Sequence, residues 1–163
     1  MGDNSINIFM INQKVHPVIQ YISNAHSEVT TLLEELFGIP VDKLFVRIED
    51  WDTQKTLDSV NGNSITSKLI ANLHKKPSDI KRINNCLTEI QKNNSWLHPI
   101  VLLELSTIPW PKLNSRVPIK KCPFDGDYFL LDGGHRCKAL LSLITEDSRF
   151  WKSMNHKVAI AYM

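Results

Sequence analysis

The sequence has few cysteines, no long apolar run and no marked excess of either charge. Its three cysteines, Cys86, Cys122 and Cys137, are widely spaced and form no CxxC pair, which argues against a disulfide framework and a zinc knuckle. No stretch approaches the roughly 18 consecutive apolar residues of a membrane-spanning helix, and the first residues lack the basic and apolar segments of a signal peptide. We therefore expect a cytoplasmic protein in a reducing compartment, without a membrane partner.

The charge balance is also weak, because 19 Lys and Arg residues against 17 Asp and Glu residues give a net charge of +2. A dedicated nucleic-acid-binding protein is usually more basic. The chain still has a dense basic cluster without interleaved aromatic residues, and a solvated face is the favoured interpretation of it, with contact to a nucleic-acid backbone as the alternative. The cluster consists of His74, Lys75, Lys76, Lys81 and Arg82.

What the chain does have is a strand, a glycine turn and a helix in direct succession, over residues 128–144 (YFLLDGGHRCKALLSLI). Glycines let a backbone approach a ligand closely, and the free N–H groups of a first helical turn favour an anion. An arginine guanidinium in that turn fits phosphate oxygens. The pattern predicts that phosphate binds at Gly133, Gly134, His135 and Arg136.

Asp132 precedes this turn, where it is placed to orient His135 or to hold a metal ion such as magnesium. The alternative is a plain tight turn. In that case Asp132 is a helix N-cap and Arg136 a solvated residue of the first turn.

The rest of the chain predicts a single mixed α/β (α+β) domain, residues 43–163, behind an N-terminal helical extension, residues 1–42. Its 42% hydrophobic content is enough for a packed core. The expected order is a short strand or loose arm over 1–14, a helix over 15–37 with a break near Ser23-Asn24, a strand over 44–48, a polar insertion or mobile loop over 53–66, helices over 67–73 and 78–92, a strand over 100–105, a long loop over 106–126, the strand and helix of 128–144, and a last strand over 158–162.

Two of these segments offer further site residues. Glu49, Asp50 and Asp52 follow the strand of 44–48, where a general base or a magnesium ligand could arise, and a solvated turn is the favoured alternative. In the 106–126 loop, Trp110 or Phe124 could stack on a base, with the alternative that each anchors the loop.

The segment LLDGGHRCKAL resembles the signature of the ParB/sulfiredoxin superfamily. Its nearest variant is the Asp-Gly-His-His-Arg form of ParB-like free serine kinases, with Gly134 at the position of the first His. The resemblance extends to HPIVLLEL at 98–105 and HKVAIAYM at 156–163, and so covers the chain from about Leu44 onward. The matching positions are Asp132, Gly133, His135, Arg136 and Ala139.

This resemblance implies a small mixed sheet surrounded by helices that binds a nucleotide, ATP/ADP or CTP, with Mg2+. Asp132, His135, Glu49 and Asp50 are then the candidate catalytic residues, and Asp132 the candidate metal ligand. The catalytic cysteine of sulfiredoxin has no counterpart, because Gly134 stands at its position, and Cys137 is expected to pack in the core. We also expect no ParB-type DNA-binding module, because the chain ends soon after the motif.

Three functions remain open. The first is a nucleotide-dependent kinase of a small-molecule acceptor, or an NTP hydrolase. The second is a nuclease of the plasmid fertility-inhibition type, with the basic cluster in a groove continuous with His135. The third is a non-catalytic module that binds a nucleotide, or a partner protein through the helix of 15–37. The oligomeric state is also open.

Overall fold

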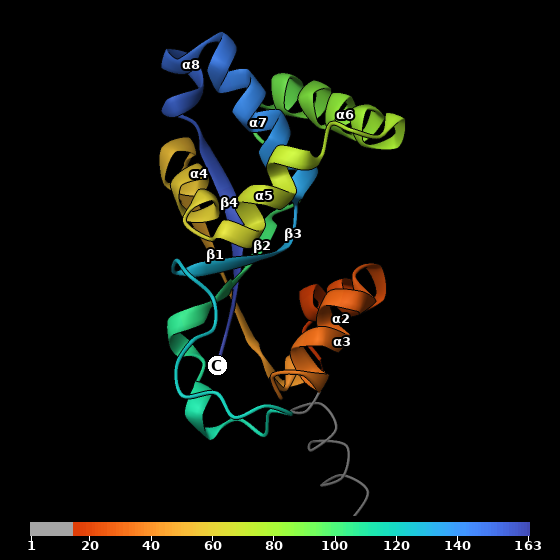
Figure 1. Ribbon diagram of the computed structural model, residues 1–163. Coiled ribbons are helices and arrows are strands. Elements are labelled where there is room, and N and C mark those ends of the chain that lie inside the picture. The colour runs from red at the N-terminus through yellow and green to blue at the C-terminus, as the bar shows by residue number, and fades with distance from the viewer. Residues whose placement is uncertain (1–14) are drawn as a thin grey trace, which may run out of the picture.

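The computed structural model describes residues 15–163, and this part of the chain contains seven α-helices and one four-stranded mixed sheet (Figure 1). The mixed α/β class is therefore confirmed, while the arm predicted for residues 1–14 lies outside the described residues. None of the helices within 15–163 combines the length and the apolar content needed to cross a membrane. The helices are α2 (Pro17–Ala25), α3 (Ser27–Glu35), α4 (Thr53–Asn61), α5 (Ser64–Asn72), α6 (Pro77–Asn93), α7 (Gly134–Glu146) and α8 (Ser148–Lys152), and the strands are β1 (Phe45–Asp52), β2 (Ile100–Glu104), β3 (Tyr128–Asp132) and β4 (Asn155–Tyr162).

The sheet has the strand order β1-β4-β2-β3. β1 and β4 are antiparallel, β4 and β2 are parallel, and β2 and β3 are antiparallel. β1 and β3 are therefore the two edges, and β4, the last strand in the sequence, lies inside the sheet. An irregularity between Val101 and Leu102 shifts the register of β2 against β3 next to the predicted motif.

Helices cover both faces of the sheet. Side chains along a strand point alternately to its two sides, so one strand can contribute to the core on each face. On β2, Ile100 and Leu102 pack into a core shared with α4 to α8. Val101 and Leu103 pack into a second core with α2, α3 and the connection from β2 to β3. Figure 1 shows α2 and α3 well apart from the α5, α6 and α7 group. α2 and α3, which belong to the predicted N-terminal extension, thus supply one layer of the structure.

The polar segment 53–66, predicted as an insertion or a mobile loop, is instead two helices. α4 begins after Asp52, whose side chain accepts a hydrogen bond from the Lys55 N–H at 2.7 Å. α5 begins after Asn63, whose side chain accepts one from the Thr66 N–H at 3.0 Å. Such caps satisfy backbone donors that a helix leaves free at its start. Leu57 and Val60, three positions apart, then bury one face of α4.

Candidate functional site

A cleft of about 760 Å³ lies at the β3 edge, with side chains of α2 and α3 on one side and of α5, α6 and α7 on the other. All five residues of the predicted motif, from Asp132 to Arg136, line it. The strand–turn–helix predicted from the sequence therefore opens into a cavity of a size that suits a small ligand.

The turn from β3 into α7 requires glycine at Gly133. Its φ of 117° is a conformation that other residues rarely adopt, and a Cβ there would lie 2.5 Å from Cγ2 of Ile100. The first N–H of α7 that bonds back along the chain is that of Cys137, to the Gly133 carbonyl at 3.0 Å. The N–H groups of Gly134, His135 and Arg136 precede it and have no carbonyl partner within the helix. The turn consequently presents three backbone donors and the positive end of a helix dipole at the cleft.

Asp132 is the centre of a charged network at this turn. Its Oδ2 accepts a hydrogen bond from the Arg136 guanidinium at 2.8 Å, and its Oδ1 lies 2.6 Å from Nε2 of His26. Arg136 also donates to the backbone carbonyls of His98 at 2.6 Å and Pro99 at 3.0 Å. The guanidinium predicted to bind phosphate is therefore engaged within the protein, where it fixes the turn to the start of β2.

The two histidines at the cleft are each held by a carboxylate. His135, which we expected Asp132 to orient, instead has its Nε2 3.0 Å from Oδ1 of Asp79 on α6. Asp132 orients His26, the residue between α2 and α3, whose side chain is 38% exposed. A carboxylate that holds one ring nitrogen fixes the tautomer of the imidazole and leaves the other nitrogen to exchange a proton.

His26 is a site residue that the sequence analysis missed. It comes 106 positions before Asp132, and no local pattern connects the two. The only sequence signal was the predicted break in the helix of 15–37, which falls close to it. At this break the His26 N–H bonds to the Ile22 carbonyl while its own carbonyl accepts from Val29 and Thr30, so the residue ends one helix and begins the next.

Arg82 is the basic side chain of α6 that lines the cleft. Among the described residues it has no ion-pair partner, in contrast to Arg136. The other members of the basic cluster, His74, Lys75, Lys76 and Lys81, do not line the cleft. Arg82 is therefore the cation available to an anionic ligand there, and most of the cluster lies elsewhere on the surface.

Glu49 and Asp50, the other candidate catalytic residues, do not line this cleft. Both lie within β1, which continues through the acidic segment that was expected to follow the strand. Glu49 accepts hydrogen bonds from Arg47 and, at 2.9 Å, from Trp51, and these bonds lower the pKa of Glu49. Asp50 forms an exposed pair with Lys157 at 3.2 Å. The structure thus separates these two carboxylates from the motif.

The donor set at the turn does not by itself fit a magnesium ion. Both oxygens of Asp132 are already taken by Arg136 and His26, and no group of three or more His, Cys, Asp or Glu side chains within residues 15–163 is arranged to hold a metal. Mg2+ is commonly bound through one or two carboxylates plus substrate phosphates. It would accordingly have to arrive with a phosphate ligand.

Neither Cys86 nor Cys137 is activated as a nucleophile. Cys137 is completely buried in the α7 core, and burial raises the pKa of its thiol to about 12. Cys86 lines the cleft, and burial raises the pKa of its thiol as well. A nucleophilic cysteine requires the opposite shift, which agrees with the packing role expected for Cys137.

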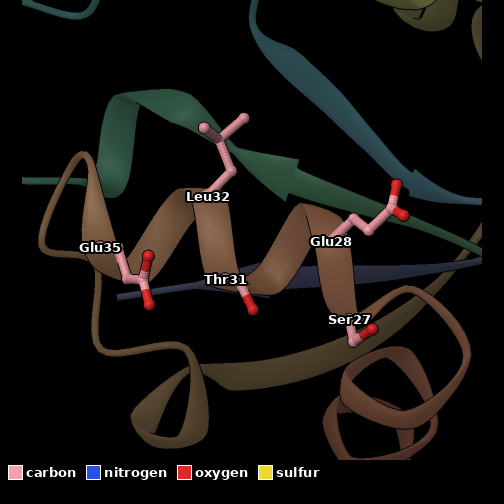
Figure 2. A pocket seen from close by; sticks show the side chains of 5 residues that line it. All are labelled: Ser27, Glu28, Thr31, Leu32 and Glu35. Carbon is pink, nitrogen blue, oxygen red and sulfur yellow. The ribbon is translucent and has the colours of Figure 1, made fainter.

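A second hollow, of about 400 Å³, lies on the outer side of α3 and is shown in Figure 2. Its lining comes from this one helix and includes the carboxylates of Glu28 and Glu35 but no residue of the motif. It offers an anion no cationic partner, so the cleft at β3 is the candidate site. Comparisons of this chain with protein-family models, with curated proteins and with solved structures found no match.

Proposed function

We propose that this chain is a nucleotide-binding protein of the ParB/sulfiredoxin type that transfers or hydrolyses a phosphoryl group. The observation that supports it most directly is the free start of α7, which opens into the 760 Å³ cleft beside an unpaired Arg82. Backbone N–H groups at a glycine turn and one available guanidinium are a recurrent way to bind phosphate. The Asp132–Arg136 ion pair leaves the turn itself nearly neutral and rigid.

In this proposal each group has a defined role. The N–H groups of Gly134, His135 and Arg136 bind phosphate oxygens, and Arg82 balances the charge that develops on them. Arg136 positions the turn. His26 accepts the proton of an acceptor hydroxyl or water on its free Nδ1, while the acceptor oxygen bonds to the terminal phosphorus. The bond from that phosphorus to the bridging oxygen breaks, and its electrons leave with the nucleoside diphosphate. Asp132 stabilises the resulting imidazolium.

The cleft also bears on the alternatives. A nuclease of the type considered would place the basic cluster along the groove, but only Arg82 of that cluster lines it. A kinase acceptor held at Glu49 and Asp50 would not lie in the cleft either, since neither residue lines it. We therefore propose that any small-molecule acceptor binds on the His26 side, and that nucleotide is the principal partner.

Calorimetric titration with ATP, ADP, CTP and GTP, with and without magnesium, tests this proposal. One nucleotide should bind the wild type with micromolar affinity, and Arg82→Ala should weaken that binding at least about tenfold, or about 1.4 kcal/mol. Lys81→Ala is the matched control, because Lys81 is the adjacent basic residue of α6 but does not line the cleft. The proposal fails if no nucleotide binds, or if the two variants lose affinity equally.

A further inference from the structure

Exposed apolar side chains gather on the walls of the cleft. Tyr21 is 55% exposed and Leu32 47% on the α2–α3 side, while Ile65 and Leu69 are each 51% exposed on α5. Single exposed apolar residues are ordinary, but several on the facing walls of one cavity are typical of a surface that a ligand covers.

Two aromatic side chains also line the cleft, and their rings are held in place by neighbouring aromatic rings. Phe124 and Phe129 line it, with ring centroids 4.9 Å apart. Phe124 is further held by edge contacts with Phe37, at 5.3 Å, and Trp110, at 6.0 Å. Trp110 itself is buried and donates from its indole nitrogen to the Leu105 carbonyl, so it anchors the loop and does not line the cleft. Phe124 thus presents a prearranged apolar surface.

The cleft also carries charged groups. His26, His135 and Arg82 line it with the start of α7, and the one acidic side chain among the described lining residues, Asp132, is neutralised by Arg136. A ligand that matches both kinds of lining has an anionic head and an apolar body. The volume of about 760 Å³ falls within the range of about 300–1,000 Å³ that is usual for small-molecule sites.

We propose that the exposed apolar side chains of the cleft form a base subsite, in which a nucleoside base contacts Tyr21 on one side and Ile65 and Leu69 on the other. This inference rests on the proposed nucleotide function and adds where the base binds. A base has apolar faces and polar edges, and the cleft supplies a partner for such an edge in the exposed amide of Asn85, which forms no hydrogen bond within the described part of the chain. An alkyl chain would instead cover that amide without pairing it.

The subsite makes the N-terminal helices part of the binding site. Tyr21 comes from α2, and His26, which lies 2.6 Å from Asp132, comes from the α2–α3 junction. A bound nucleotide would therefore contact both helical layers at once, its phosphates at α7 and its base against α2. Purines, with the larger apolar faces, should bind more tightly than pyrimidines.

The test compares ATP, inorganic tripolyphosphate and octyl phosphate by calorimetry on the wild type, Tyr21→Ala and Leu97→Ala. Leu97 is the control, because it is 64% exposed and lies outside the cleft. We expect ATP to bind more tightly than tripolyphosphate, and Tyr21→Ala to weaken ATP about tenfold while tripolyphosphate binding stays unchanged. Leu97→Ala should alter neither. Circular dichroism of each variant checks that it is folded.

The other results separate the two proposals. If tripolyphosphate binds the wild type as tightly as ATP, or Tyr21→Ala weakens both equally, the base subsite is refuted while the phosphate site stands. Tighter binding of octyl phosphate than of ATP would assign the apolar region to an alkyl chain and also refute the base subsite. If neither ATP nor tripolyphosphate binds, the nucleotide function fails and the subsite with it.

Discussion

Replacing Asp132 by asparagine tests whether an ion pair holds the motif turn. The side chain of Asp132 is 11% exposed and that of its partner Arg136 15%. Breaking a fully buried pair by removing one charge costs about 3–5 kcal/mol, whereas a fully exposed pair contributes about 0–1 kcal/mol. These two groups keep some contact with water, and an amide oxygen can still accept a hydrogen bond. We therefore expect the variant to lose about 2 kcal/mol of unfolding free energy.

For a chain of 163 residues, a loss of that size lowers Tm by about 4–8 °C, and urea denaturation measures the free energy directly. Asp50→Asn is the matched control, because it makes the same chemical change in the Asp50–Lys157 pair, where both side chains are 63% exposed. The control should unfold at the wild-type urea concentration. Equal midpoints for Asp132→Asn and the control would refute the view that this network stabilises the turn.

Three further predictions concern the glycine turn and two buried groups. Gly133→Ala should destabilise the protein by at least about 1 kcal/mol in urea, because of its φ of 117° and the clash with Ile100, whereas Gly62→Ala, at a φ of −64°, should change little. Cys137 should react with a thiol reagent only after unfolding, so that the native protein titrates no more than two of its three thiols. Burial lowers the pKa of His156 from 6.5 to about 4. Stability should therefore be complete above about pH 6.5, where this histidine is neutral in both states, and up to about 3 kcal/mol of it should be lost as the pH falls toward 4. His156→Gln should flatten that part of the stability curve, and an unchanged slope would contradict the assignment.

The parts of the fold that the sequence predicted are those with strong local patterns. The apolar run of 100–105 became β2, one of the two inner strands, and the run before Asp132 became β3. The glycine turn and the helix after it also lie where the pattern predicted them, because φ freedom, apolar period and free N–H groups are properties of neighbouring residues. The residues of the phosphate-site prediction all line one cleft, although binding itself stays a prediction.

The error at 53–66 has a different cause. Thr53 and Thr56 have polar side chains, yet both are fully buried. Thr53 shares a hydrogen bond of 2.7 Å with His156, and Thr56 donates to the Asp52 carbonyl at 2.8 Å. A hydroxyl satisfied in this way is nearly as compatible with a core as an apolar group. The hydrogen-bond partner of Thr53 is on β4, about 100 residues away. The polar composition of 53–66 could not reveal this partner, and it therefore predicted a loop.

Long-range pairing also explains why the residues found at the site differ from those that the sequence predicted. His26 and Asp79 are unremarkable in the sequence, and each acquires a role only through a partner on a distant element, Asp132 and His135 respectively. Arg136 lies in the turn where the sequence predicted it, but its role depends on hydrogen bonds to backbone carbonyls of the segment before β2. Such pairings are decided by the tertiary fold, and no spacing rule within one segment could have predicted them.

The position of β4 between β1 and β2 has a consequence for biosynthesis. β1 and the β2–β3 pair leave the ribosome first, but no backbone ladder joins them until residues 155–162 have been made, because β4 pairs with both β1 and β2. Until then β1 and β2 each present an unpaired edge with exposed apolar residues nearby, a state prone to aggregation. The sheet therefore forms only after β4 has left the ribosome, and ribosome-bound chains that stop before residue 155 should depend on chaperones.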